Sequence, residues 1–175
     1  MISRPKLELV TFSVRPARTS DVPHIQALVE PLVQKRILLG KDLVVLFEAV
    51  QEFRVAVDEN DVPIGCGALH VMWTYLGEVR TLAVAPEYLH RGAGHALLER
   101  IEVDAKALGL SRLFCLTFET EFFGKHGFEA ISEEIVAPDV YAQLTLSPDD
   151  GIAEFLDLAR VKQNTLGNTR MLKAL

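Results

Sequence analysis

The sequence predicts an α/β domain, with α and β elements mixed along the chain around one mixed sheet, and three observations lead to this prediction. The chain has 175 residues, so one domain of ordinary size is expected over residues 1–175. Of these residues 49% are hydrophobic and 24% are charged, which suits a sizeable core and excludes a disordered chain. Strand-like and helix-like segments follow in the order β-α-α-β-β-β-α-β-α-β, typical of a sheet covered by helices.

In the first half of the chain, two helices are expected between a short strand and a run of three strands. The short strand covers residues 9–17. The first helix covers about 20–34, because residues 19–21 offer N-caps, Pro23 lies in the first turn and apolar residues recur at helical spacing. Pro31 predicts a kink or an early end of this helix. A second amphipathic helix over 43–50 precedes strands over 53–57, 64–73 and 77–84, with a turn at 58–61.

The second half begins with the clearest helix of the chain, over residues 92–108. Apolar side chains recur there at helical spacing, and Gly109 stands where a C-terminal cap belongs. A strand over 113–118, a short helix ending at Gly127 and a strand over 128–131 follow. Beyond Pro138 the pattern weakens, with a helical turn expected at 140–144 and a closing strand at 170–175. Residues 133–166 are left open as either a partner surface or a lid.

Charge, hydropathy and cysteine usage disfavour several function classes. A net charge of −6 argues against nucleic acid as the main partner. No apolar run approaches the roughly 20 residues that cross a bilayer, and the start of the chain is unlike a secretory signal, so we expect a cytoplasmic protein with no membrane partner. Cys66 and Cys115 lie far apart and provide neither a disulfide framework nor a zinc cluster. No metal is expected, and a homodimer is left open.

The most informative stretch is the turn between the strand at 77–84 and the helix at 92–108. A helix start presents unpaired backbone N–H groups and a partial positive charge, which suit phosphate oxygens. Gly92 and Gly94 would let these groups approach a pyrophosphate with no Cβ in the way. Leu97 stands where a Rossmann fingerprint has its third glycine, and a P-loop's Gly-Lys-Ser/Thr is absent, so both of those folds are disfavoured. A plain strand–helix turn remains the alternative.

Two motifs resemble those of the GNAT acetyltransferase superfamily. Residues 82–98 read LAVAPEYLHRGAGHALL and match the form Leu-Ala-Val-x-Pro-x-Tyr-Arg/Gln-x-x-Gly-x-Gly-x-x-Leu-Leu at every fixed position except Leu89. Residues 122–128 read FFGKHGF and match Phe-Tyr-x-Lys-x-Gly-Phe except at Phe123. The resemblance implies the GNAT fold, a mixed and mostly antiparallel sheet flanked by helices. It also implies acetyl-CoA as the acetyl donor.

The same resemblance implies which residues contact acetyl-CoA. The backbone of Leu82, Ala83 and Val84 would pair with the pantetheine arm like an added strand. Leucine at 89 would remove one side-chain contact but no backbone donor, and the arginine at 91 either adds charge near the phosphates or is a solvated surface residue. The turn implied to hold the pyrophosphate consists of Leu89, His90, Arg91, Gly92, Ala93 and Gly94.

Further segments resemble the acetyltransferase half of bacterial N-acetylglutamate synthases and, more closely, short stand-alone amino-acid N-acetyltransferases of arginine biosynthesis. These segments are residues 14–22, 37–39, 64–69, 78–84 and 168–172. The likeness implies transfer of acetyl to the α-amino group of L-glutamate, the first step of arginine biosynthesis. The alternatives are another acceptor, namely L-glutamine, a protein N-terminus or another small amine, and a non-catalytic acyl-CoA-binding regulatory domain.

Such a transfer needs a base for the α-ammonium group and a donor for the oxyanion. Glu78 is the candidate base, since strand alternation predicts one face for Glu78, Arg80, Leu82 and Val84, next to the implied position of the thioester. The simpler alternative is an ion pair between Glu78 and Arg80. Family likeness gives the oxyanion donor as a backbone N–H near Leu82 or Ala83.

The leaving thiolate also needs an acid, and the usual tyrosine of the second motif is replaced by Phe123. Thr117, Thr120 and water are left open as substitutes.

Three cations are candidates for binding the carboxylates of an acidic amino acid: Lys41, Arg80 and Arg170. All three lie in segments that resemble the synthases near their substrate site, and a planar guanidinium can hold a carboxylate with two parallel hydrogen bonds. Arg80 is the strongest of the three, because an arginine inside an apolar strand needs a partner. The simpler alternatives are a solvated Lys41 at a helix start and an Arg170 that flanks a sheet edge.

Overall fold

The computed structural model describes residues 11–132, 136–156 and 166–175. Within these ranges, seven strands form one sheet in the order β1-β2-β3-β4-β5-β7-β6. Only the β4–β5 pair is parallel, and the other neighbours are antiparallel. The predicted single sheet, mixed and mostly antiparallel, is therefore confirmed.

The elements follow the predicted order closely, and most of their ends lie within two residues of the predicted ones. The strands are β1 (Ser13–Pro16), β2 (Phe53–Val57), β3 (Pro63–Trp73), β4 (Leu76–Val84), β5 (Arg112–Thr117), β6 (Glu129–Ala130) and β7 (Thr169–Ala174). The helices are α1 (Val22–Gln34), α2 (Leu43–Glu48), α3 (Ala93–Ala107), α4 (Thr120–Lys125), α5 (Pro138–Leu144) and α6 (Asp150–Phe155).

Three details differ from the prediction. Pro31 does not end α1, which continues to Gln34. The helix α6 was not predicted, because its six residues carry no helical apolar repeat long enough to be recognised. The strand expected over 9–17 is shorter, and its first two residues lie outside the described part of the chain.

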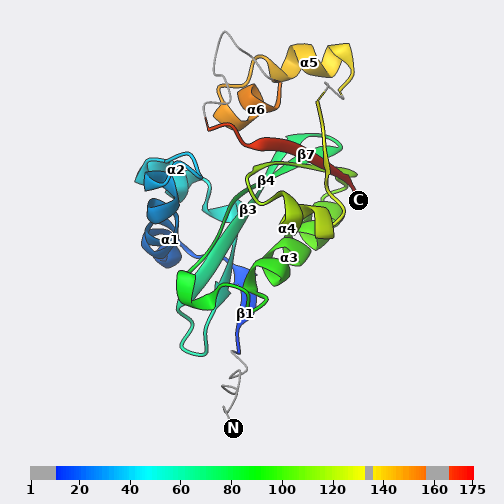
Figure 1. Ribbon diagram of the computed structural model, residues 1–175. Helices are drawn as coiled ribbons and strands as arrows, with labels where there is room; N and C mark the ends of the chain where they lie inside the picture. Colours follow the sequence, from blue (N-terminus) through cyan, green and yellow to red (C-terminus); the bar gives the residue numbers. More distant parts are fainter. Residues whose placement is uncertain (1–10, 133–135, 157–165) are drawn as a thin grey trace.

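Helices cover both faces of the sheet (Figure 1). On one face, α3 and α4 bury Leu98, Ile101 and Phe123 against Val79 and Cys115 of the central strands. On the opposite face, α1 and α2 pack at one end, where the buried cluster includes strand residues from β2 to β4. The pair α5 and α6 packs at the other end of that face, over the apolar side chains of β3, β4 and β5. The β4 residues between these two clusters are Glu78 and Arg80.

A β-bulge in β4 changes which side chains share a face. Ala68 of β3 lies opposite Arg80 and Cys66 lies opposite Ala83, so two β4 residues, Thr81 and Leu82, lie opposite one β3 residue. Thr81 has a φ of 57°, in the left-handed region.

The extra residue reverses the alternation that follows it, so the prediction that Leu82 and Val84 share a face with Glu78 and Arg80 is wrong. Leu82 and Val84 instead pack in the cluster that contains Ala93 of α3.

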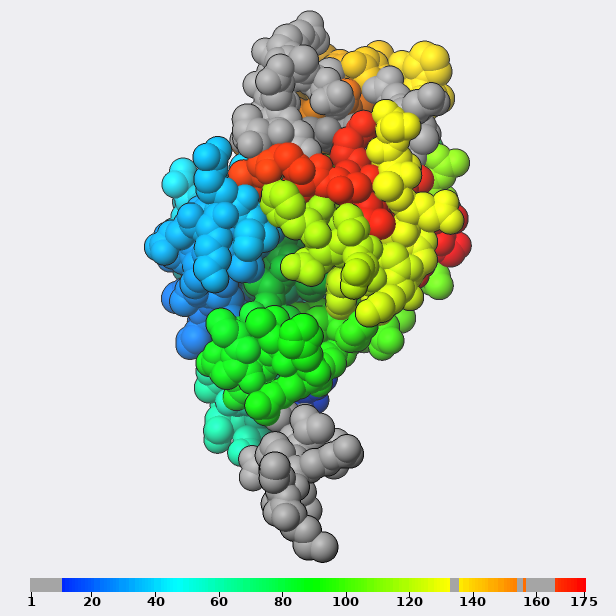
Figure 2. All heavy atoms as spheres, viewed as in Figure 1, coloured from blue at the N-terminus to red at the C-terminus, as the bar shows by residue number. Residues whose placement is uncertain are grey.

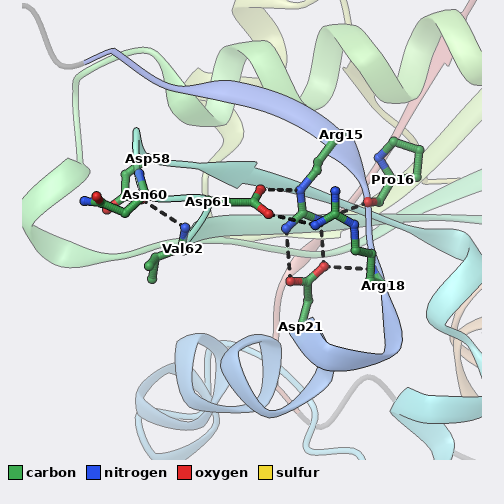
Figure 3. A network of polar contacts seen from close by, with 8 residues as sticks. All are labelled: Arg15, Pro16, Arg18, Asp21, Asp58, Asn60, Asp61 and Val62. Atoms are coloured by element: carbon green, nitrogen blue, oxygen red, sulfur yellow. Dashed lines mark hydrogen bonds and ion pairs between the residues drawn. The ribbon is translucent and has the colours of Figure 1, made fainter.

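The start of α1 is fixed by a network of ion pairs with the β2–β3 turn (Figure 3). Arg15 of β1 donates hydrogen bonds to Asp21 at 2.7 and 3.1 Å and to Asp61 at 2.7 Å. Asp21 also accepts the backbone N–H of Arg18 at 2.7 Å. Burial raises the pKa of the Asp21 carboxyl, but the bonds from Arg15 and Arg18 outweigh burial and keep this pKa below its usual value. The network therefore ties β1, the start of α1 and the β2–β3 turn together and contributes to stability.

Candidate active site

The strands β4 and β5 separate along their length. Their parallel pairing comprises Leu76 with Arg112, Gly77 with Leu113 and Glu78 with Phe114, and it ends there. In the described chain, the backbone of β4 after Glu78 therefore has a strand beside it only on the β3 side. Figure 2 shows the surface hollowed between α1 and α2 (blue), the turn before α3 (green) and α4 (yellow-green). An extended ligand can add to such an open strand edge through main-chain hydrogen bonds.

The turn that follows β4 presents backbone N–H groups at the start of α3. His90 and Gly92 both have left-handed φ values, 60° and 91°, so the backbone changes direction sharply just before α3 begins. Gly92 is the N-cap of α3, and no side chain caps the helix. The first helical bond at this turn joins Ala96 N–H to Gly92 C=O, which leaves the preceding N–H groups of the helix without intrahelical acceptors.

One expected donor of this turn is already used. The backbone N–H of Leu89 donates to the carbonyl oxygen of Pro86 at 3.3 Å, and the Leu89 side chain is 49% exposed. An anion at this turn is therefore expected to rely on the N–H groups from His90 onward. Gly94 has an ordinary helical backbone, and its contribution is the close packing of Phe122, 3.6 Å from where a Cβ would stand.

Glu78 and Arg80 form a buried ion pair on the face opposite α3. Arg80 donates to Glu78 Oε2 from Nη2 and, at 2.9 Å, from Nε. The side chains of Glu78 and Arg80 are only 6% and 11% exposed. The simpler alternative considered for Glu78, a pair with Arg80, therefore describes the observed geometry, and a role as a base is compatible with it.

The other side of the Arg80 guanidinium is held by a residue that the sequence analysis missed. Asp149, just before α6, accepts from Arg80 Nη1 at 3.0 Å and from Nη2 at 2.9 Å. Burial raises the pKa of the Asp149 carboxyl, but the hydrogen bonds and charge of Arg80 outweigh burial and hold that pKa well below its usual range. Asp149 is separated from Arg80 by 69 residues and belongs to no recognisable motif, so the sequence offered no signal for it.

The loop into α6 packs directly on this pair. A Cβ at Gly151 would lie 2.7 Å from Glu78 Oε2 and 2.8 Å from Arg80 Nη2, so the loop fits closely only because this residue is glycine. His70 of β3 lies directly opposite Glu78 of β4, and its Nδ1 pairs with Glu52 Oε1 at 2.8 Å. The loop at Asp149–Gly151, within the described part of residues 133–166, thus lies directly over the candidate base.

The other two predicted cations are placed separately. Lys41 lines a pocket between α1, α2 and β4, together with Val33, Leu39 and Thr81. This pocket and Arg80 are adjacent, because Thr81 follows Arg80 in β4. Arg170 of β7 lies opposite Leu116 of β5. Two residues further along, Leu172 lies opposite Phe114, and both pack in the cluster under α5 and α6, so Arg170 shares the face of Glu78.

Thr117, Thr120 and water remain the candidates for the acid that protonates the leaving thiolate. Phe123 is buried with its ring edge-on to Phe128 at a centroid distance of 5.1 Å, so it contributes to the core and has no proton to give. Thr117 is 7% exposed, and its Oγ1 accepts the backbone N–H of Glu119 at 2.8 Å. That bond leaves its hydroxyl proton free to be donated elsewhere. Thr120 is the first residue of α4.

The described ranges contain no group of three or more His, Cys, Asp or Glu side chains arranged to hold a metal ion. Nor do these ranges contain a helix that is both long and apolar enough to span a membrane.

The comparison with protein families identifies the fold. The profile of the acetyltransferase (GNAT) family matches residues 27–128, more than half of the chain. The chain belongs to the acetyltransferase (GNAT) family. The predicted GNAT fold and acetyltransferase class are therefore confirmed.

Sequence relatives of this GNAT acetyltransferase fall into two length classes. It is 54% identical over 164 residues to an amino-acid acetyltransferase of Mycobacterium tuberculosis. That alignment covers 93% of this chain and 94% of the relative. It is 39% identical over 136 residues to an amino-acid acetyltransferase of Pseudomonas fluorescens. That alignment covers 77% of this chain but only 30% of the relative.

Solved structures show the same two classes. Rv2747 from Mycobacterium tuberculosis, solved in complex with CoA, has a TM-score of 0.88 and 52% identity and covers 93% of this chain and 99% of its own. The N-acetylglutamate synthase from Neisseria gonorrhoeae, complexed with coenzyme A and N-acetyl-glutamate, has a TM-score of 0.75 and 29% identity. That match covers 96% of this chain and 36% of the synthase.

Proposed function

We propose that this GNAT acetyltransferase transfers acetyl from acetyl-CoA to the α-amino group of an amino acid, with L-glutamate as the acceptor. The observation that carries the proposal is the position of the buried Glu78–Arg80 pair, at the point where β4 and β5 separate. An acid–base group and a carboxylate-binding group thereby lie beside an open strand edge and a helix start. The amino-acid acetyltransferase and N-acetylglutamate synthase among the relatives support this acceptor class.

The donor fits the described backbone. The pantetheine arm of acetyl-CoA would add to β4 through the backbone of Leu82, Ala83 and Val84, where β5 has diverged. The pyrophosphate would accept from the N–H groups between His90 and Gly94, where the N-cap Gly92 leaves α3 without a side-chain cap. The coenzyme A complexes of two similar structures support this placement.

The chemistry follows from the two faces of β4. Glu78 would take a proton from the acceptor ammonium, so that the neutral amine can attack the thioester carbonyl. The backbone N–H of Leu82 would donate to the oxyanion of the tetrahedral intermediate. A proton from Thr117, Thr120 or water would then complete the departure of the thiolate of CoA.

Acceptor recognition needs a rearrangement at Arg80. Its guanidinium can hold a carboxylate with two parallel bonds, but Asp149 occupies that side. An acceptor carboxylate would take the place of Asp149 on Arg80, with Lys41 and Arg170 as further cations on the same side of the sheet. L-Glutamine remains the nearest alternative acceptor, since it differs only in its side-chain amide.

Two measurements test the proposal. Release of free CoA from acetyl-CoA is measured with each of the twenty amino acids, with L-glutamate expected to give the highest kcat/KM. Glu78→Gln is expected to lose turnover while retaining CoA binding, and Glu59→Gln, in the exposed β2–β3 turn, is the matched control. Full turnover in Glu78→Gln would refute the base, and CoA binding without turnover for any amine would favour a non-catalytic acyl-CoA-binding domain.

A further inference from the structure

A buried thiol lies against the bulge of β4. Cys66 of β3 is fully buried, and its Sγ lies 3.5 Å from the carbonyl oxygen of Thr81, within hydrogen-bond range for sulfur. Thr81 is the bulge residue with the left-handed φ of 57°. A β-branched residue pays conformational energy in that region, so its backbone needs surrounding contacts that hold it. The proposed reaction gives Cys66 no chemical role.

The peptide plane connects this thiol to the candidate oxyanion donor. The carbonyl of Thr81 and the N–H of Leu82 belong to one peptide unit, and in a trans peptide they point in opposite directions. The Thr81 carbonyl points toward Cys66 on β3. The Leu82 N–H therefore points away from β3, to the side where β4 has lost its pairing with β5.

The thiol is in the right protonation state to donate. Burial raises the pKa of the Cys66 thiol to about 12, so it is protonated throughout the neutral range. A protonated thiol can donate to a carbonyl, whereas a buried thiolate could not. The same burial excludes Cys66 as a nucleophile toward the thioester.

We propose that Cys66 is a positioning residue for acetyl transfer: its S–H bond to Thr81 fixes the peptide that presents the Leu82 N–H to the thioester oxygen. The inference rests on the proposed function, since it takes the thioester to lie along β4. It predicts that losing the S–H donor slows the chemical step and leaves both substrates bound as before.

The test compares Cys66→Ala, Cys66→Ser and Cys115→Ala. Cys115 is equally buried, at 1% exposure in β5, and lies in a different cluster, so it controls for the loss of a buried sulfur. Cys66→Ala is expected to lower kcat about tenfold, with KM for acetyl-CoA and for the amino acid within about twofold of the wild-type values. Cys66→Ser keeps a donor and is expected to recover most of kcat, while Cys115→Ala leaves kcat within about twofold.

A second measurement separates this inference from the proposed function. In ¹⁵N-labelled protein, the amide shift of Leu82 is expected to move when acetyl-CoA replaces CoA, and this response is expected to shrink in Cys66→Ala but not in Cys115→Ala. This readout needs no turnover, so it applies even if the acceptor is wrong or Cys66→Ala is poorly stable at assay temperature. An unchanged kcat together with an unchanged Leu82 response in Cys66→Ala would overturn the proposal.

Discussion

The occupation of Arg80 by Asp149 makes Asp149→Asn the most informative single substitution. Asn keeps Oδ1, which accepts the Ile152 N–H at 3.1 Å at the start of α6 and Arg80 Nη2 at 2.9 Å. It replaces Oδ2, which accepts Arg80 Nη1 at 3.0 Å, with an amide nitrogen that cannot accept. The local fold is therefore expected to survive while the competing carboxylate is removed.

The magnitude follows from the bonds that are lost. Asp149 is ionised at neutral pH, because Arg80 holds the pKa of its carboxyl well below the usual range. Both side chains are largely buried, so one charge-assisted bond is worth about 1.5 kcal/mol. Losing that bond on Arg80 lowers the energy needed to displace residue 149, and KM for the amino acid is expected to fall about tenfold. KM for acetyl-CoA is expected to change little, because the turn before α3 does not involve Asp149.

The assay is steady-state CoA release with L-glutamate varied at saturating acetyl-CoA, for wild type, Asp149→Asn and Asp139→Asn. Asp139 is an exposed acidic residue of α5, so its substitution removes the same charge without touching Arg80. A rise in KM for the amino acid in Asp149→Asn would refute the reasoning, since it would mean that Asp149 helps to bind the acceptor instead of competing with it.

Two stability predictions follow from other parts of the fold. Asp21→Asn is expected to lower the free energy of unfolding by about 2 kcal/mol at pH 7. The folded-state pKa of Asp21 is depressed, so this contribution is present above its unfolded pKa near 3.9 and is lost as pH falls through the folded-state pKa. The urea unfolding curves of wild type and variant should therefore converge at acid pH, below the folded-state pKa of Asp21. Gly92→Ala is expected to cost about 1–2 kcal/mol in the same assay, because φ is 91° there while the nearest side-chain atom is 3.9 Å from the added Cβ. Gly94→Ala, inside the first turn of α3, is expected to be neutral or stabilising, and an equal loss in both variants would contradict the role given to the left-handed backbone.

The helices and strands and the turn at the start of α3 were predictable because their signals are local. Helix and strand periodicity placed almost every element, and the glycines at 92 and 94 marked the turn at the start of α3. At Gly92 the left-handed φ confirms that a glycine was needed for the backbone itself. The proximity of Glu78 and Arg80 followed from strand alternation over two residues, where the strand is still regular.

Two features of the site were not predictable, for different physical reasons. Asp149 reaches Arg80 across 69 residues of sequence, and such a contact depends on how the segment packs on the sheet. Gly65 and Gly67 of β3 hinted at a bulge or a close backbone approach in this region, and Gly67 does lie opposite the bulge. In β4 itself no residue marked the bulge, because its left-handed position is filled by threonine, a residue type that rarely takes it. The prediction therefore continued the in–out alternation of strand side chains through Leu82 and Val84, which in fact lie on the face opposite Glu78 and Arg80.

In the proposed reaction, the bulge would let one strand contact both substrates. Before it, Glu78 and Arg80 face the side covered by α1 and α6, where an amino acid would bind. After it, Leu82 and Val84 pack toward α3, which brings the end of β4 into the turn that would bind the pyrophosphate. A regular strand would direct Leu82 to the face of Glu78, and α3 would lose that contact. The left-handed Thr81 thus belongs to a geometry in which the candidate base lies on one face and, under the inference above, the Leu82 N–H at the bulge would face the thioester.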